Sequence, residues 1–384
     1  MDSLTLTTGL ILFIALLPYI GLIGFFTWGW YVYSRQSLVV SRKSMVVDNY
    51  FSDKVSVVIA ARNEEKHIAD LLSDLMEQDY PQEMMEIIIV DDRSVDQTAE
   101  VVQDFISKNE AENICLIRMD GHRMGGKKMA LARGIDHASG EIIMTTDADC
   151  RAGTGWISAM TEGFHDDRLK MVFGPVTYFT GSKLSDHFQA LDYLGMMASG
   201  AGSANAGFPF MCSGASLAYR REAFYEVNGF RGNEDFLSGD DVFLLHKMKK
   251  EFGRRAAGFC MKKAALVRTY PADGFRSFIS QRVRWASKSK GYKDLLAVYT
   301  ALIVFLAGLL MTAVFFLGLL SPAMILLFLG FIVIKTLTDL PLMLGVTGFT
   351  GQRKLMRWFF PFQLIYPFYI VTAGILSLLN RKKW

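Results

Sequence analysis

Long apolar runs without charged residues lie near both ends of the chain, and shorter patterns fill the residues between them. The first run, residues 10–33, exceeds the ~20 apolar residues that a helix needs to cross a bilayer. The second, residues 295–334, is about twice that length, and Ser321-Pro322 divides it into two candidate spans. A last run covers residues 359–379. We therefore expect membrane helices on both sides of a soluble domain.

These runs predict four regions in chain order. They are a transmembrane anchor over residues 1–34, a cytoplasmic α/β domain over 50–270, an amphipathic interfacial helix over 271–294, and a transmembrane region of two or three spans over 295–384. A cleavable signal peptide is the alternative for the first run. No basic segment precedes that run, however, and its apolar core is too long for such a peptide, so we expect a retained anchor.

Basic residues beside the spans predict the orientation. Arg35, Arg42 and Lys43 follow the first span, so the positive-inside rule places the soluble domain in the cytoplasm of a cell bounded by this membrane. The basic cluster at residues 381–383 disagrees, because four full spans would put it outside. Either that cluster is an exception, or the last segment lies in the membrane without crossing it.

Between residues 55 and 146, short apolar runs alternate with segments whose apolar residues recur at helical spacing. This alternation predicts an α/β layer with a mostly parallel sheet. The expected strands are residues 55–61, 86–90, 114–119 and 141–146, and the expected helices are residues 64–77, a segment opening at Ser94, and residues 127–139. Further on, the patterns predict strands over 171–179 and 210–219 and helices over 221–227, 240–250 and 275–289.

Acidic residues follow the predicted strands. Asp91 and Asp92 end one strand, and Asp147 and Asp149 follow another, where alternation along an extended chain points both carboxylates to the same side. Ligands of parallel sheets bind beyond the carboxyl ends of the strands. Two converging carboxylates suit Mg²⁺ or Mn²⁺, which prefer oxygen ligands. The alternative is a loop in which the aspartates accept turn hydrogen bonds.

Composition excludes other classes of protein. The net charge of +3 is too small to indicate a nucleic-acid partner, and the sequence has no basic stripe with interleaved aromatics. The four cysteines stand far apart without a CxxC pair, which suits a reducing cytosol and argues against structural zinc.

Six segments in fixed order carry a resemblance to a known family. They are VSVVIAARNEE, EIIIVDDRSVDQT, GGKKMALARGIDHASGEIIMTTDAD, SGASLAYRREAFYEVNGF, SGDDVFLL and QRVRW. Together they resemble the membrane-bound family 2 glycosyltransferases, which include cellulose, chitin and hyaluronan synthases and ceramide glucosyltransferases. The resemblance covers about residues 55 to 290. It implies a Rossmann-like α/β domain of the GT-A type that binds a nucleotide sugar.

The resemblance also implies roles for individual residues. Arg62, Glu64 and Asp92 would hold the base and ribose of the nucleotide, and Lys127 would lie near the diphosphate. A surface salt bridge is the alternative for the first three, and an ordinary helix position for Lys127. Asp149 would bind the metal, with Asp147 assisting it or touching the ribose.

Removal of a proton from the acceptor hydroxyl needs a base, and we assign this role to Asp241. The family shows a Glu-Asp pair at this place, whereas this chain has Asp240-Asp241. A literal Glu234-Asp235 pair lies nearby and competes for the assignment. We prefer Asp241 because apolar residues of helical pattern follow it.

The QRVRW segment completes the candidate site. On a helix, Gln281, Arg284 and Trp285 share a face, where Arg284 would meet the diphosphate and Trp285 would offer a flat surface to a sugar ring near the acceptor. The alternative, which is compatible with the first, is an interfacial anchor on the bilayer made by aromatic, apolar and basic residues of this helix. They are Phe275, Phe278, Ile279 and Trp285 with Arg276 and Arg282.

We therefore expect an inverting glycosyltransferase that moves a sugar from a nucleotide sugar to a membrane lipid. The expected donor is a UDP-sugar, because the Asp92 carboxylate can accept a hydrogen bond from the imide N–H of uracil. The alternatives are a processive polysaccharide synthase and a non-catalytic membrane partner of one. Within the third predicted span, Lys335 and Asp339 stand at i and i+4, where mutual neutralisation is the simpler account and a functional role the other.

Overall fold

The computed structural model describes residues 3–40, 53–119, 126–232, 236 and 239–379, and the chain divides into two compact units. The sheet unit comprises residues Tyr33–Phe179 and Gly207–Tyr270, and the helical unit comprises Met1–Val32, Thr180–Ala206 and Pro271–Lys382. The chain therefore leaves the sheet unit after Phe179 and returns to it at Gly207.

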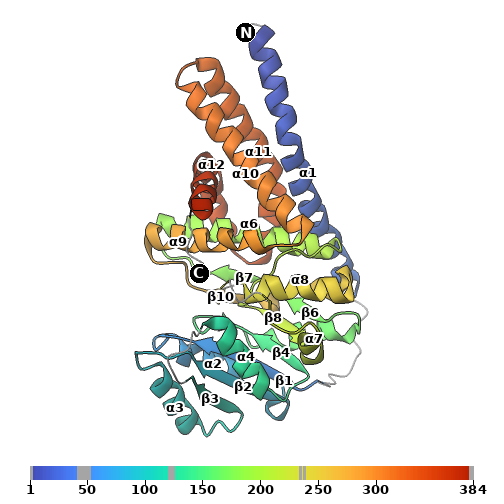
Figure 1. Ribbon diagram of the computed structural model, residues 1–384, viewed down its shortest axis with the longest axis vertical. Helices are drawn as coiled ribbons and strands as arrows, with labels where there is room; N and C mark the ends of the chain where they lie inside the picture. The colour runs from blue at the N-terminus through green and yellow to red at the C-terminus, as the bar shows by residue number, and fades with distance from the viewer. Residues whose placement is uncertain (1–2, 41–52, 120–125, 233–235, 237–238, 380–384) are drawn as a thin grey trace. The chain divides into compact units, whose positions relative to one another are not determined.

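A seven-stranded sheet forms the core of the sheet unit, in the order β3-β2-β1-β4-β8-β6-β9 (Figure 1). Its first four strands are parallel, whereas β8 runs antiparallel to both neighbours. The strands are β1 Val55–Ala61, β2 Met85–Asp91, β3 Ile114–Arg118, β4 Ile142–Thr145, β6 Met171–Phe173, β8 Leu217–Arg220 and β9 Ala257–Phe259. The predicted α/β layer is confirmed. The apolar runs that predict it form β1, β2 and β4, and almost all residues of these strands are buried.

Helices connect these strands. They are α2 Ile68–Met76, α3 Thr98–Asn109, α4 Lys127–His137, α5 Trp156–Thr161, α7 Arg221–Glu226 and α8 Asp240–Phe252. Helix α4 packs against β1 and β2, and its Gly134 has no room for a larger residue, since a Cβ there would lie 2.4 Å from Val58 Cγ1. The apolar face of α2, with Ile68, Leu71 and Leu75, is buried as its spacing predicts.

The single strand predicted over residues 171–179 is wrong. The chain forms β6 and then β7 Val176–Tyr178, which lies in a separate sheet of order β5-β10-β7, with β5 at Arg151–Ala152 and β10 at Val267–Thr269. Gly174-Pro175 makes the break, because Pro175 has no N–H for a ladder hydrogen bond and its carbonyl accepts instead from Val267 N at 3.0 Å. The strand predicted over 210–219 likewise shortens to β8.

The helical unit consists of long helices. They are α1 Ser3–Val40, α6 Leu184–Asn205, α9 Gly274–Ser287, α10 Leu295–Gly318, α11 Pro322–Phe349 and α12 Met356–Leu379. Four segments are long and apolar enough to cross a membrane, namely Phe13–Val32, Leu295–Gly318, Pro322–Phe349 and Arg353–Leu379. The break between α10 and α11 falls at Ser321, where Pro322 opens the next helix as expected. Helix α12 continues through Pro361 and Pro367.

Helix α11 is longer than the apolar run that predicts it, because a polar network neutralises its charges. Lys335 Nζ lies 2.6 Å from Asp339 Oδ2 and donates to Gln363 Oε1 of α12 at 2.7 Å. Tyr19 of α1 donates its hydroxyl to Asp339 Oδ1 at 2.7 Å. The ion pair and its two hydrogen-bond partners thus connect three helices. These contacts stabilise two charges that would be unfavourable if they were unpaired among apolar side chains.

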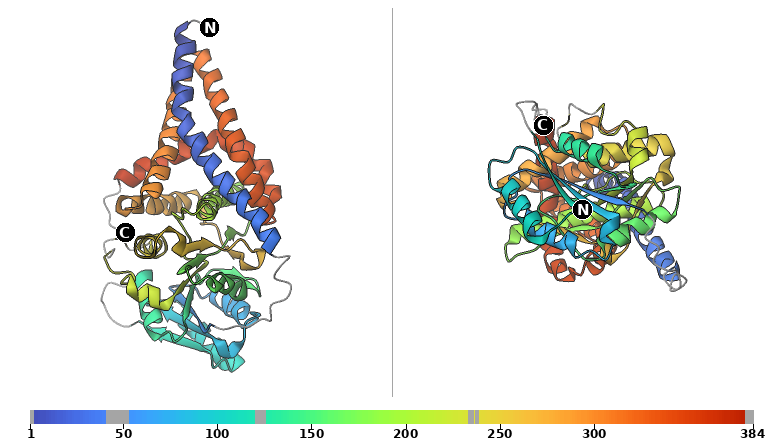
Figure 2. Two further views of the ribbon diagram at one scale, coloured as in Figure 1. Left: turned by 90° about the vertical axis from the view of Figure 1, so that its right-hand side faces the viewer. Right: turned by 90° about the horizontal axis from the view of Figure 1, so that it is seen from below.

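Helix α1 packs directly on the backbone of α6 and lies beside α11 (Figure 1 and Figure 2). A Cβ atom at Gly29 would lie 1.9 Å from the carbonyl oxygen of Gly202, and one at Gly202 would lie 2.1 Å from that of Phe26. Only glycine fits at such a crossing. Trp30 of α1 also packs edge-on against Phe349 of α11, so α1 is an integral part of the helical unit.

Candidate active site

The loops after β1 and β2 are tied together at the carboxyl edge of the parallel strands. Asn63 N donates to Ser94 Oγ at 3.0 Å, and Val95 N donates to Asn63 Oδ1 at 2.9 Å. Glu64 N donates to Thr98 Oγ1 at 2.8 Å. Because parallel strands end at one edge, these bonds place Glu64 beside the loop that follows β2.

Arg62 and Asp92 lie at this edge in different environments. Arg62 is exposed, whereas Asp92 is buried and its N–H donates to Ala61 O at 2.8 Å. The Asp92 carboxylate accepts from Arg93 Nε at 3.0 Å, so it already has a cationic partner. Arg93 has a positive φ of 57°, which few residues without local hydrogen bonding adopt.

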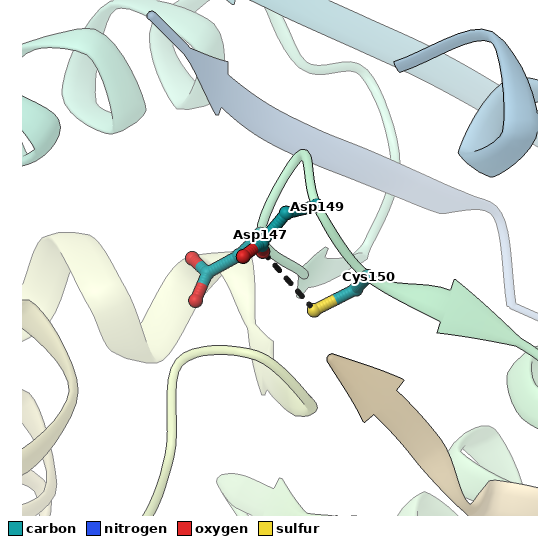
Figure 3. Close-up of side chains that lie close together, drawn as sticks. All are labelled: Asp147, Asp149 and Cys150. Atoms are coloured by element: carbon teal, nitrogen blue, oxygen red, sulfur yellow. Dashed lines mark hydrogen bonds between the residues drawn. The ribbon is translucent and has the colours of Figure 1, made fainter. Parts of the chain in front are cut away.

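Asp147 and Asp149 lie together in the loop after β4, with Cys150 beside them (Figure 3). One ligand atom from each of the three residues lies within 4.8 Å of the others. Thr269 of β10 donates its hydroxyl to Asp149 Oδ2 at 3.1 Å, and the Cys150 thiol lies 3.8 Å from Asp149 Oδ1. The two aspartates thus lie close together as predicted, but in a turn after β4 and not in an extended segment.

The donor set at this loop fits a hard divalent cation. Burial, and then the charge of Asp147, raise the pKa of Asp149, as expected where two carboxylates share a site that a cation would stabilise. Burial and the same two carboxylates raise the pKa of the Cys150 thiol, which therefore stays protonated and is a poor metal ligand. The two carboxylates are the ligands that Mg²⁺ and Mn²⁺ prefer.

Lys127 connects two acidic segments. It opens α4, and its ammonium forms an ion pair with Asp147 and lies 3.8 Å from Asp240 Oδ2. Burial acts to lower the pKa of Lys127, but Asp147 and Asp240 outweigh it and raise that pKa above its usual range. Lys127 therefore stays positively charged. Its two carboxylate partners offset the unfavourable position of a cation at the N-terminus of a helix.

Asp241 is held at the start of α8 by two backbone donors. Val242 N donates to its Oδ1 at 2.8 Å, and Gly214 N donates to its Oδ2 at 3.2 Å. Asp240 is buried, whereas Asp241 is half-buried. The competing pair at residues 234 and 235 lies outside the described residues.

Gly214 is a site residue that the sequence reasoning missed. Its carbonyl accepts from Thr145 Oγ1 at 3.0 Å, so it lies beside the end of β4. A Cβ atom at this position would lie 3.2 Å from Asp240 Oδ2 and 3.4 Å from Lys127 Nζ. The glycine between serines in the SGAS segment is the signal that could have found it, since glycine permits close approach of a backbone.

Glu64 provides a prediction about pH. Burial, and then Asp149 and Asp147, raise its pKa to about 7. Between its ordinary value of 4.5 and about 7 the folded state holds the extra proton, so Glu64 lowers stability as pH rises through this range. A cation bound at Asp147 and Asp149 would weaken the repulsion between these carboxylates and Glu64, so Glu64 would release its proton. We expect Mn²⁺ affinity to rise between about pH 6 and pH 8, less so in Glu64→Gln.

Calorimetry in two buffers of different ionisation enthalpy measures the proton released per Mn²⁺. The matched control is Glu77→Gln, which replaces an exposed glutamate at the end of α2 and should behave as the wild type. Equal proton release in the wild type and Glu64→Gln would contradict the prediction.

Gln281, Arg284 and Trp285 lie on α9, in the helical unit. Arg282 donates from Nη1 to Gln281 Oε1 at 2.9 Å, and its guanidinium lies 4.2 Å from the centroid of the Trp285 ring. Arg282 itself is buried, so the interfacial-anchor interpretation is wrong for this residue. Arg284 is half-buried and has no ion pair within the described part of the chain.

Two models of glycosyltransferase families match this chain. The family model described as Glycosyl transferase family group 2 matches residues 142–372, and that described as Glycosyl transferase family 2 matches residues 56–227. A poly-beta-1,6-N-acetyl-D-glucosamine synthase of Staphylococcus epidermidis is 26% identical over 66% of this chain and 57% of its own. A beta-monoglucosyldiacylglycerol synthase of Nostoc sp. is 30% identical over 31% of this chain and 25% of its own.

The chain thus spans about half, or less, of the length of these curated relatives. Among solved structures, a mannosyltransferase from Pyrobaculum calidifontis, in complex with GDP-Man and Mn²⁺, matches with a TM-score of 0.62. It is 18% identical, and the match covers 97% of this chain and 99% of that one, which confirms the GT-A fold. Since one family model covers more than half of the residues, the chain belongs to the family 2 glycosyltransferases.

Proposed function

We propose that this protein transfers a sugar from a nucleotide sugar, a UDP-sugar in the first instance, to a hydroxyl group of a membrane lipid. The observation that carries the proposal is the group formed by Asp147, Lys127, Asp240 and Asp241, with Asp149 adjacent, at the carboxyl edge of the parallel strands. A cation among acids at this edge suits a ligand that carries a diphosphate and a metal ion.

The donor would bind across the strand ends. Lys127 would contact the diphosphate, for which its fixed positive charge is suited. Arg62, Glu64 and Asp92 would hold the base and ribose, and Asp92 suits the imide N–H of uracil because a carboxylate accepts hydrogen bonds. A purine nucleotide is the alternative donor, as in the structural relative solved with GDP-Man.

Asp149 and Asp147 would hold Mg²⁺ or Mn²⁺. When bound, the ion neutralises the negative charge of the departing nucleoside diphosphate. Lys127 now pairs with Asp147, so binding of the diphosphate to Lys127 would free this carboxylate for the ion. The chain's own contribution is to keep the two carboxylates adjacent and to fix Asp149 through Thr269.

Asp241 would act as the base. The acceptor oxygen attacks the anomeric carbon from the face opposite the diphosphate, so the new C–O bond forms as the bond to the diphosphate oxygen breaks. That bond's electron pair leaves with the nucleoside diphosphate, and the hydroxyl proton passes to an Asp241 oxygen. Attack from the opposite face inverts the anomeric centre. The backbone donors Gly214 and Val242 would hold the carboxylate for this step.

The acceptor would be a lipid hydroxyl met near Gln281, Arg284 and Trp285. Four candidate spans support a membrane location, and the soluble part would face the cytoplasm of the cell, with this membrane as the inner or cell membrane. The Nostoc relative is named for a lipid product, whereas the Staphylococcus relative is named for a polysaccharide. A processive polysaccharide synthase is therefore the second candidate.

The test incubates membranes containing the protein with labelled UDP- and GDP-sugars and then extracts lipid and polymer separately. We expect label from one UDP-sugar in the lipid fraction, with one sugar added per lipid. Label in long polymer favours the synthase, and no transfer from any donor favours a non-catalytic membrane partner. Either result overturns the proposal of a lipid acceptor.

Replacing Asp149 by Ala should remove metal dependence together with activity. With the carboxylate gone, only Asp147 remains as an oxygen ligand in this loop, and Mn²⁺ affinity should fall about 100-fold. Titration of Mn²⁺ in the presence of UDP measures the loss. The control is Asp166→Ala, at a half-buried aspartate whose carboxylate bonds to the backbone and side chain of Arg168. Unchanged Mn²⁺ affinity in Asp149→Ala would remove this residue from the metal site.

A further inference from the structure

A buried ion pair in the helical unit connects α9 to two other helices. Arg282 of α9 donates from Nε to Asp192 Oδ2 of α6 at 2.7 Å, and Tyr369 of α12 donates its hydroxyl to the same oxygen at 3.2 Å. The side chains of Arg282 and Asp192 are only 4% and 2% exposed. These two charges are thus enclosed by protein, and neither is placed to bind a ligand directly.

Arg282 contacts both flanking members of the QRVRW segment. Its Nη1 donates to Gln281 Oε1, which leaves the amide nitrogen of Gln281 to face another group. Its guanidinium plane lies 4.2 Å from the Trp285 ring centroid and 4.8 Å from that of Phe278. One arginine therefore contacts both a glutamine amide and an indole ring, and Tyr193 of α6 also lies against that ring.

A buried pair of this kind stabilises a fold little, because loss of hydration offsets most of the attraction. The planar fork of Arg282, in contrast, can bond Asp192, bond Gln281 and stack on Trp285 at the same time. The contribution of Arg282 is therefore to place Gln281 and Trp285 relative to each other, more than to stabilise the fold.

We propose that Asp192 and Arg282 are positioning residues for the acceptor, holding Gln281 and Trp285 in the arrangement that receives a lipid hydroxyl. The inference rests on the proposed function. Asp192 orients Arg282, and Arg282 orients the two side chains that meet the acceptor. Neither residue touches the substrate.

The decisive variant is Arg282→Lys, which keeps the charge opposite Asp192 but lacks the fork and the stacking plane. We expect a melting temperature near that of the wild type and an acceptor KM raised about 10-fold or more, with the donor KM unchanged. The double variant Asp192→Leu with Arg282→Met removes both charges, at the cost of the Tyr369 hydrogen bond, and should show the same raised acceptor KM. Arg276→Lys, at an exposed arginine of the same helix, is the control.

The assay uses dioleoylglycerol in mixed micelles and UDP-glucose, with the full chain in detergent. Hydroxyl-radical footprinting of Trp285 supplies a readout independent of turnover, and oxidation should be faster in Arg282→Lys and in the double variant than in Arg276→Lys. Wild-type oxidation of Trp285 in both would overturn the inference, as would a wild-type acceptor KM. Lack of lipid transfer by the wild type with every donor would instead overturn the proposed function, and footprinting would still decide the role of Arg282.

Discussion

Asp241→Asn is expected to lower sugar transfer about 1,000-fold while UDP and Mn²⁺ bind nearly as in the wild type. Asparagine keeps the size of the side chain. Its one amide oxygen can accept from Val242 N or from Gly214 N, which bond to different oxygens of Asp241, so one of these two hydrogen bonds is lost. Asparagine cannot take a proton from the acceptor hydroxyl. Initial rates at saturating donor, together with calorimetric titration of UDP, separate the two effects.

Glu251→Gln is the matched control for this variant, because it changes an exposed carboxylate at the other end of α8. Its rate should equal that of the wild type. Turnover of Asp241→Asn at the wild-type rate would exclude Asp241 as the base and return the role to the pair at residues 234 and 235.

Gly29→Ala should have the largest effect on folding. The added methyl group would lie 1.9 Å from the carbonyl oxygen of Gly202. No side-chain rotation relieves this clash, because the backbone fixes the positions of both the Cβ atom and the carbonyl oxygen. Helices α1 and α6 must move apart, and we expect a loss of about 3 kcal/mol in the free energy of unfolding. Thermal unfolding in detergent, followed by intrinsic fluorescence, measures it.

Gly21→Ala supplies the comparison on the same helix, since a Cβ atom at Gly21 has no neighbour within 4 Å. Alanine favours the helix by about 1 kcal/mol over glycine, so this variant should be at least as stable as the wild type. Equal stability of the two variants would show that the crossing of α1 and α6 tolerates a side chain.

Apolar patterning was enough to predict the elements that bury one regular face. Residues 55–61 form β1 as expected, and the helices expected over residues 64–77 and 127–139 are α2 and α4, each shorter than predicted. Helix α6 was not predicted, because its small residues, among them Gly195 and Gly202, form no apolar stripe. The second sheet was missed for a different reason, since strands of two or three residues are too short to show alternation.

The candidate site was predictable to the extent that it follows the strand ends. Asp147 and Lys127 were both singled out, but their ion pair depends on where α4 begins relative to β4, which no local pattern contains. Thr269 and Gly214 were missed because their contacts with Asp149 and Asp241 span 120 and 27 residues of sequence. The pairing of Arg282 with Asp192 was missed because it depends on α6.

The excursion of the chain through α6 has a practical consequence for obtaining the enzyme without a membrane. A fragment that starts after α1 and stops before α9 retains α6 but loses α1, α9, α11 and α12, against which α6 packs. Gly202 would lose its neighbour Phe26, and Asp192 would lose Arg282 and Tyr369. Shortening the gene from both ends should therefore yield an aggregating product, whereas replacing residues 180–206 with a short polar linker offers a route to a water-soluble catalytic unit.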